Sequence, residues 1–254
     1  MMRRVSRLSV LAFVLLASVG CATAQQGASS YKPRMRGGWE ILFDGKNLDA
    51  WDVAPGTNGW AIDDQKNLTV TGPGRNLYTK RRYCDFVLDL DYRIVGRRKC
   101  NSGVFIRVHD KNDEVNTGME IQILDDDDYG VKWDAMNANG ALYDLVHPSV
   151  DANKPVGEWE HFRITVKGSQ VTVVSNGKEI VKADLSKWTE PGKNPDGQHN
   201  KFPHAIGSLP REGFIGLQNY GGVPVWFRDI RIKPLSTRQP KFTGAEPIED
   251  VLGK

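Results

Sequence analysis

The feature that most constrains the fold of this chain is a succession of short segments in which apolar and polar residues alternate. In DFVLDLDYRIV, apolar side chains occupy every second position from Phe86 to Tyr92, with Asp89 and Asp91 between them. A period of two is typical of a β-strand with one buried face. Similar segments recur along the chain: WEILF, SGVFIRV, MEIQIL, ALYDL, HFRITVKG, QVTVVS, GFIGL and VWFRDIRI.

Turn signals separate these segments, and patterns of helical period are almost absent. Asn176-Gly177 is typical of a two-residue hairpin turn, and Asp63–Asn67 predicts a second hairpin. About a dozen short strands with such turns predict an all-β fold with two packed antiparallel sheets. The stretch from Leu185 to Ser208 is a long loop and hence a candidate for function, although we expect its histidines, His199 and His204, to be exposed.

The start of the chain has the pattern of a signal peptide. A basic stretch with Arg3, Arg4 and Arg7 precedes the apolar run from Leu8 to Val19, which is too short for a membrane span. Residues 1–24 therefore predict export to the periplasm or beyond. Cleavage after Ala24 fits an A-x-A site. Alternatively, SVGC resembles a lipobox with Cys21 as the lipidated residue, in which case the membrane is a partner through this anchor. Because Ser18 is a poor match there, the first cut is preferred.

The remaining boundaries follow from composition. Residues 25–37 are polar with Gly, Ser and Pro and predict a disordered linker. Residues 38–236 form the predicted sandwich domain, and 237–254 are a C-terminal tail without a pattern. The net charge is only +3, and no basic stripe follows the strands, so we expect no nucleic-acid partner.

The order of the segments resembles the 3-keto-disaccharide hydrolase-like family. The most specific pair is NSGVF-x-R followed by GMEIQILDD. The resemblance covers Trp39 to Pro234 and also includes WEILFDGKNLDAW, NLYTKRRYCDFVLDLDYRI, GALYDLVHP, KPVGEWEHFRITVKG, VTVVSNGKEI and GFIGLQNYGG–VWFRDIRI. It implies a concanavalin A-like jelly-roll sandwich with a concave sugar-facing sheet. It also implies exported enzymes that act on glycosides already oxidised to a ketone at C3.

Alternation assigns faces to the residues of MEIQIL. Met119, Ile121 and Ile123 share one wholly apolar face, which belongs in the core. Glu120 and Gln122 therefore face the concave side. A retaining glycosidase needs two carboxyl groups about 5–5.5 Å apart. In this strand the second carboxylate is missing unless Asp125 supplies it across a bulge, so a two-carboxylate mechanism is disfavoured.

A 3-keto glycoside needs different chemistry, because the ketone acidifies the hydrogen on C2. One base removes this hydrogen, the C1 substituent leaves by elimination, and water then adds. We hypothesise that Glu120 is the base. Arg107 and His109 share a face of the preceding segment with Phe105, so either is expected to approach Glu120 and to stabilise the enolate.

Further candidates would bind the sugar or a metal ion. Gln122 and Gln218 could hydrogen-bond to sugar hydroxyls, and Tyr143 and Trp226 could stack on a pyranose, although strand aromatics more often belong to the core. The run Asp125–Asp128 is usually a solvated turn, but carboxylates on a loop also suit Ca²⁺, with Asp125 and Asp126 as ligands.

Three functions remain open at this point. The first is an exported enzyme that cleaves 3-keto glycosides or disaccharides. The second is a non-catalytic, lectin-like carbohydrate-binding module, which would need only aromatic and amide side chains. The third is a structural domain of the cell surface. The sandwich is compatible with all three, because the fold alone does not decide the function.

Overall fold

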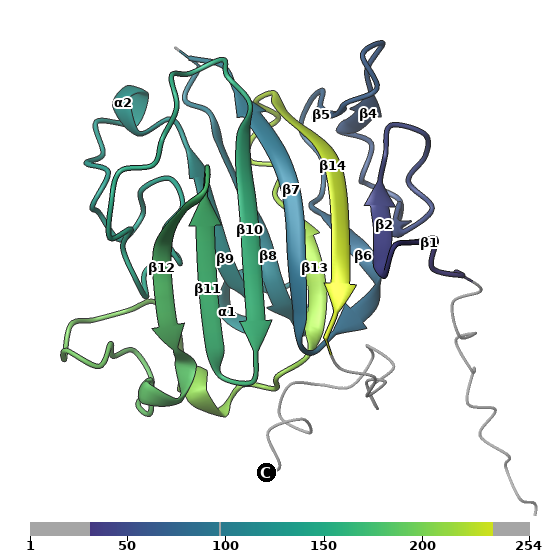
Figure 1. Cartoon of the computed structure of the whole chain (residues 1–254). Helices are drawn as coiled ribbons and strands as arrows, with labels where there is room; N and C mark the ends of the chain where they lie inside the picture. Colours follow the sequence, from purple (N-terminus) through teal and green to yellow (C-terminus); the bar gives the residue numbers. More distant parts are fainter. Residues whose placement is uncertain (1–30, 97, 236–254) are drawn as a thin grey trace, which may run out of the picture. The chain divides into compact units, whose positions relative to one another are not determined.

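The structure is a computed structural model that describes residues 31–96 and 98–235 (Figure 1). Within these residues the strands form two antiparallel sheets that pack face to face, as expected for a jelly-roll sandwich. The order of the nine-stranded sheet is β1-β2-β14-β7-β10-β11-β12, with β5 paired to β14 and β4 paired to β5. The order of the five-stranded sheet is β3-β6-β13-β8-β9.

The larger sheet contains the strands β1 (Met35–Arg36), β2 (Trp39–Phe43), β4 (Trp60–Ile62), β5 (Leu68–Val70), β7 (Phe86–Ile94), β10 (Glu160–Lys167), β11 (Gln170–Ser175), β12 (Lys178–Asp184) and β14 (Val225–Pro234). The smaller sheet contains β3 (Trp51–Asp52), β6 (Leu77–Tyr83), β8 (Asn101–Val108), β9 (Met119–Leu124) and β13 (Gly213–Leu217). Short helical turns lie in the connections: α1 (Glu114–Thr117), α2 (Asp126–Tyr129), η1 (Leu185–Lys187) and η2 (Ile206–Ser208).

The core lies between the two sheets and follows the predicted alternation. Leu88 and Leu90 of β7 are buried in it, together with Val104 and Ile121 of the smaller sheet. Removal of this apolar surface from water stabilises the fold by about 25 cal/mol per Å² of buried area. The side chains that alternate with the core residues must therefore point to the two outer faces of the sandwich.

The predicted hairpin turn at Asn176-Gly177 is confirmed. Asn176 and Gly177 have φ angles of 50° and 85°, which are the left-handed values that a type I′ turn requires. In contrast, the ALYDL segment is not a regular strand. It runs beside β9 as an isolated bridge between Ile121 and Leu142, and the tight turn from Leu142 to Val146 prevents a longer ladder.

The N-terminal boundary of the domain is a correction to the sequence prediction. Residues 25–37 were expected to be a disordered linker, but Met35 and Arg36 form β1 and pair with β2. The Ile41 amide also donates a hydrogen bond to the Arg34 carbonyl, which extends this pairing. The predicted signal peptide 1–24 and the tail 237–254 lie outside the described residues. In the part of the chain that is described, no helix has the length and apolar character needed to span a membrane.

Candidate functional site

The outer face of the five-stranded sheet carries a row of aligned residues that ends at Glu120. Gly216 of β13 pairs with Tyr78 of β6 on one side and with Phe105 of β8 on the other, and Phe105 pairs with Glu120 of β9. Directly opposed residues of antiparallel strands point to the same face. The predicted orientation of Glu120, away from the core residue Ile121, is therefore confirmed.

A second, polar row lies beside the first. Gly103 pairs with Gln122, and the backbone N–H of Gln218 donates a hydrogen bond to the Gly103 carbonyl at 2.9 Å. No partner among the described residues reaches the buried Oε1 atoms of Gln122 and Gln218. Unpaired buried amide oxygens are costly, so both residues have unused hydrogen-bonding capacity for a polar ligand.

Burial dominates the electrostatics of Glu120. Its side chain is 6% exposed, and no described residue donates a hydrogen bond to its Oε1. Burial raises the pKa of Glu120 to about 7, with Lys201 lowering it and the like charge of Glu114 raising it. Glu120 is therefore partly ionised near neutral pH, which suits a general base.

Lys201 is the cation that sequence reasoning missed. Its Nζ lies 4.4 Å from the centre of the Tyr143 ring, and the Tyr143 amide donates to the Glu120 carbonyl at 2.9 Å. Burial lowers the pKa of Lys201, while the charges of Glu120 and Asp144 raise it. The sequence marked the long loop of residues 185–208 as a functional candidate, but nothing in its composition distinguished Lys201 from other surface lysines.

Glu114 lies at the other end of these rows. It comes from the short helix α1, and Asn76 beside Tyr78 donates a hydrogen bond to its Oε1 at 2.8 Å. Its negative charge acts on both Glu120 and Lys201. The outer face thus brings together carboxylates, the Lys201 ammonium group and several amides from seven separate segments of the chain: residues 76–78, 103–105, 114, 120–122, 143–144, 201 and 216–218.

Arg107 does not lie where the sequence predicted. The ladder between β8 and β9 ends at Ile106 and Met119, and Arg107 has a left-handed φ of 53°. Alternation therefore fails at this residue. The Arg107 guanidinium donates to the carbonyls of Gly168 at 2.8 Å and Cys84 at 3.3 Å, away from Glu120.

His109 is also engaged elsewhere. Its Nε2 lies 3.1 Å from the Pro210 carbonyl oxygen. Burial, together with the charge of Arg82, lowers the pKa of His109 to about 4, so the ring is neutral at physiological pH. Lys201, rather than Arg107 or His109, is the cation whose charge acts on Glu120.

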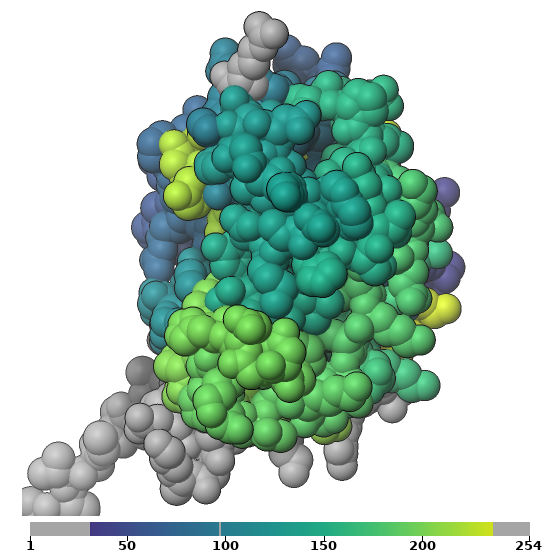
Figure 2. All heavy atoms as spheres, turned by 90° about the vertical axis from the view of Figure 1, so that its left-hand side faces the viewer, coloured from purple at the N-terminus to yellow at the C-terminus, as the bar shows by residue number. Residues whose placement is uncertain are grey.

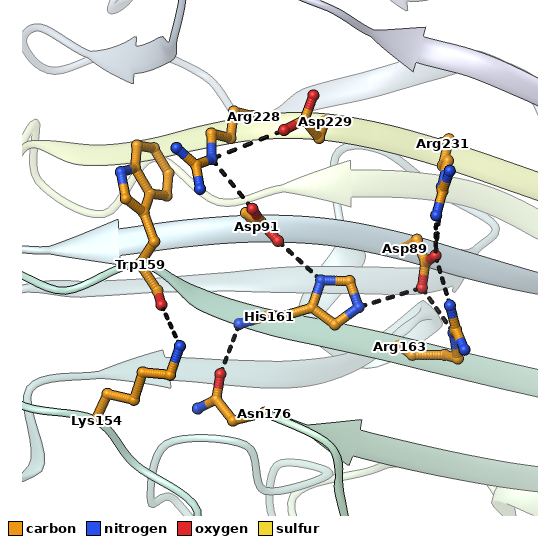
Figure 3. A network of polar contacts seen from close by, with 10 residues as sticks. All are labelled: Asp89, Asp91, Lys154, Trp159, His161, Arg163, Asn176, Arg228, Asp229 and Arg231. Carbon is orange, nitrogen blue, oxygen red and sulfur yellow. Dashed lines mark hydrogen bonds and ion pairs between the residues drawn. The ribbon is translucent and has the colours of Figure 1, made fainter.

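Trp226 belongs to the other sheet. It lies on β14 between the core residues Val225 and Phe227, so it points to the outer face of the nine-stranded sheet, and the Arg93 guanidinium stacks on its ring at 5.0 Å. The expectation that Trp226 accompanies Glu120 is therefore wrong. The same face carries the polar network of Figure 3, in which Arg228 lies between Trp159 and Asp91.

Asp125 and Asp126, which follow β9, accept hydrogen bonds from nearby segments of the chain. Asp125 caps helix α2 by accepting a hydrogen bond from the Asp128 amide at 3.1 Å. Asp126 accepts from the Asn139 amide and from the Asn153 side chain, and burial raises its pKa to about 6. No three His, Cys, Asp or Glu side chains of the described residues are arranged to hold a metal ion. The Ca²⁺ site suggested by the sequence, with Asp125 and Asp126 as ligands, stays a prediction.

Comparisons with known proteins identify the family of this chain. A curated 3-keto-disaccharide hydrolase of Bacteroides thetaiotaomicron is 29% identical over 234 residues, which cover 78% of this chain and 79% of the relative. A crystal structure from Parabacteroides distasonis, provisionally described as a glycosyl hydrolase, is 36% identical with a TM-score of 0.68 and covers 78% of this chain and 99% of its own.

A second Parabacteroides distasonis structure with the same description shares the fold at 23% identity and a TM-score of 0.63, over 78% of this chain and 94% of its own. The sequence profile of the 3-keto-alpha-glucoside-1,2-lyase-like domain matches residues 38–233. The resemblance seen in the sequence is thus confirmed, and the chain belongs to the 3-keto-alpha-glucoside-1,2-lyase-like family.

Proposed function

We propose that this protein cleaves the glycosidic bond of 3-keto glycosides, with Glu120 as the base that removes the C2 hydrogen. The observation that carries the proposal is the state of Glu120, a buried carboxylate with a free oxygen and a pKa of about 7. The names of the relatives support a glycoside-active enzyme. Their substrate class is extended to this chain as part of the proposal.

The reaction has two halves. Glu120 takes the proton from C2, and the electron pair of the C2–H bond delocalises onto the C3 ketone oxygen as an enolate. The enolate then expels the C1 oxygen with its bonding pair, which leaves a C1=C2 double bond, and the departing oxygen takes up a proton. Water adds to C1 and loses a proton, while protonated Glu120 returns a proton to C2. The sum is hydrolysis of the glycoside, and Glu120 is regenerated.

Lys201 supplies the positive charge that this sequence needs. A cation held beside the developing enolate stabilises it more strongly in a half-buried site than it would in water. The ring of Tyr143 holds the Lys201 ammonium in place by a cation–π contact. Gln122 and Gln218 bind sugar hydroxyls with their unpaired amide oxygens.

The residues of β9 do not supply what the conventional alternative requires. A retaining glycosidase would need a second carboxylate about 5–5.5 Å from Glu120 on the opposite side of the glycosidic bond. Within β9 the residues that follow Glu120 on its face are Gln122 and the buried Leu124, and Asp125 is used as a helix cap. The elimination route requires only one carboxylate at C2.

Turnover tests the proposal. Residues 25–254 should release 3-keto-glucose from 3-keto-trehalose or 3-keto-sucrose, and Glu120→Gln should abolish this release. Saturable sugar binding without turnover by the wild type would instead indicate a lectin-like module. We also infer export from the N-terminal sequence; mass spectrometry of the mature protein would distinguish an N-terminal Gln25 from a lipidated Cys21.

A further inference from the structure

Asp144 has a left-handed backbone conformation, which is uncommon for residues other than glycine. Its φ is 63°, in the left-handed region, and its amide donates to the Met136 carbonyl at 2.9 Å. Non-glycine residues in this region are uncommon and are often found at functional sites. Asp144 directly follows Tyr143, the residue whose amide binds the Glu120 carbonyl.

The side chain and the carbonyl of Asp144 bind the long loop at two points. Oδ2 accepts a hydrogen bond from the Lys201 amide at 2.6 Å, and the carbonyl accepts from Nδ2 of Asn194 at 3.2 Å. Oδ1 of Asn194 in turn accepts from Trp188 at 2.7 Å and from Asn200 at 3.1 Å. Figure 2 shows the green loop lying against the teal segment to which these bonds attach it.

Two consecutive residues therefore connect the two charged groups of the site. Tyr143 is bonded to the strand that carries Glu120, and Asp144 is bonded to the loop residue Lys201. The Lys201 side chain then returns over the Tyr143 ring. Together these contacts fix the Lys201 ammonium group relative to the Glu120 carboxylate, although the two residues lie far apart in the sequence.

We infer that Asp144 is a positioning residue that holds the Lys201 ammonium in its place beside Glu120. The inference rests on the proposed function, because it assigns a catalytic purpose to the position of Lys201. A merely structural Asp144 would stabilise the loop without affecting the chemistry. The two possibilities differ in which property of the enzyme changes when the carboxylate is removed.

The left-handed backbone of Asp144 offers clean variants. Glycine and asparagine tolerate this conformation, so Asp144→Gly removes the side chain and Asp144→Asn removes only the charge, both without backbone strain. Asp229→Gly is a matched control, since Asp229 also has a left-handed φ of 51° and its side chain is 76% exposed on the other sheet.

We expect kcat of Asp144→Gly on a 3-keto disaccharide to fall by about 10- to 100-fold, because a small displacement of a catalytic group has effects of this size. KM should change little, and Asp229→Gly should match the wild type. Hydrogen exchange of the Lys201 amide, read by NMR without substrate, should accelerate in Asp144→Gly. In Asp144→Asn the alkaline limb of the kcat profile should move to lower pH, because a neighbouring negative charge that raises the Lys201 pKa is lost.

The inference would be overturned if Asp144→Gly showed faster exchange at the Lys201 amide but wild-type kcat, and Asp144→Asn showed an unmoved alkaline limb. The hydrogen bond between Asp144 and the Lys201 amide would then have a structural role only. Unchanged hydrogen exchange of the Lys201 amide in Asp144→Gly would also overturn the inference, because Asp144 would then not hold this amide. Failure of the proposed function would give a different result. The wild type would turn over no 3-keto glycoside, while the Lys201 amide would still exchange faster in Asp144→Gly than in the wild type. In that case the catalytic purpose assigned to Asp144 is rejected as well.

Discussion

The carboxylate of Glu120 lies against Gly103 of the neighbouring strand, in space that a side chain at position 103 would occupy. Gly103 has an ordinary backbone conformation, so the absence of a Cβ serves this close approach rather than a turn. The glycine thereby determines where the proposed base lies on the sheet.

Gly103→Ala tests this relationship. The added methyl group collides with the end of a flexible side chain, so we expect the fold to persist and Glu120 to move. Turnover should fall by about 10- to 100-fold, as expected for a misplaced base. Circular dichroism checks the fold, and steady-state kinetics checks the rate. Wild-type kcat in a folded Gly103→Ala enzyme would contradict this placement of the base.

Glu120→Gln should stabilise the protein at alkaline pH while it inactivates the enzyme. The pKa of Glu120 is raised from 4.5 to about 7, so its contribution to stability is fully present below pH 4.5 and is lost as the pH rises through 7. The neutral amide avoids this loss, which amounts to a gain on the order of 3 kcal/mol at pH 8.

Urea denaturation at pH 4.5 and pH 8 provides the measurement. The difference in unfolding free energy between Glu120→Gln and the wild type should grow between these two pH values. A constant difference would show that the carboxyl is not strained by burial, and the account of its pKa would then be wrong.

Lys201 should control the acidic limb of the pH–rate profile. Its positive charge lowers the pKa of Glu120, so Lys201→Met should raise this pKa and move the acidic limb of kcat/KM to higher pH. It should also reduce kcat over the whole range, because the enolate loses its counter-charge. Lys201→Arg keeps the charge and should keep the position of the limb. Identical profiles for Lys201→Met and the wild type would remove Lys201 from the mechanism.

The network on the opposite sheet should affect stability but not chemistry (Figure 3). Asp89 is buried and accepts hydrogen bonds from Arg163 and Arg231, and His161 lies 3.4 Å away. Asp89→Asn leaves these cations poorly compensated and should cost on the order of 2 kcal/mol of unfolding free energy. Its kcat should match the wild type. A loss of kcat without a loss of stability would connect this face to the reaction.

The same network gives a pH window. Hydrogen bonds to Asp89 and Asp91 raise the pKa of His161 to about 9. Its contribution to stability is therefore fully present below pH 6.5 and is lost as the pH rises through 9. We expect His161→Gln to remove this alkaline decline, measured as the dependence of the unfolding midpoint on pH between 6 and 10.

Periodicity predicted most of the fold because it reports which side chains are buried. It placed Glu120 and Gln122 opposite Ile121, and the structure agrees. It failed at Arg107, where one left-handed residue at the end of a ladder redirects the side chain. For Trp226 it left open whether the ring belongs to the core or to an outer face, and alternation contains no information on which of two sheets a strand joins.

The part of the site that the sequence did not predict depends on long-range contacts. The charge of Lys201 acts on Glu120, and the Lys201 amide is bonded to Asp144, which lies 57 residues earlier in the chain. No local pattern encodes such a contact. The four aspartates after β9 likewise resembled a solvated turn or a metal site, whereas Asp125 starts a helical turn as its cap.

The most direct test of the central claim is deuterium incorporation during one turnover in D₂O. Glu120 removes the C2 proton, and exchange of this proton with solvent before C2 is protonated again should give 3-keto-glucose with one solvent deuterium at C2, measured by mass spectrometry and NMR against product incubated without enzyme. Glu120→Gln should give neither product nor label. Release of unlabelled 3-keto-glucose by the wild type, together with no primary kinetic isotope effect when the substrate carries deuterium at C2, would contradict the account, because the bond would then break without proton abstraction at C2.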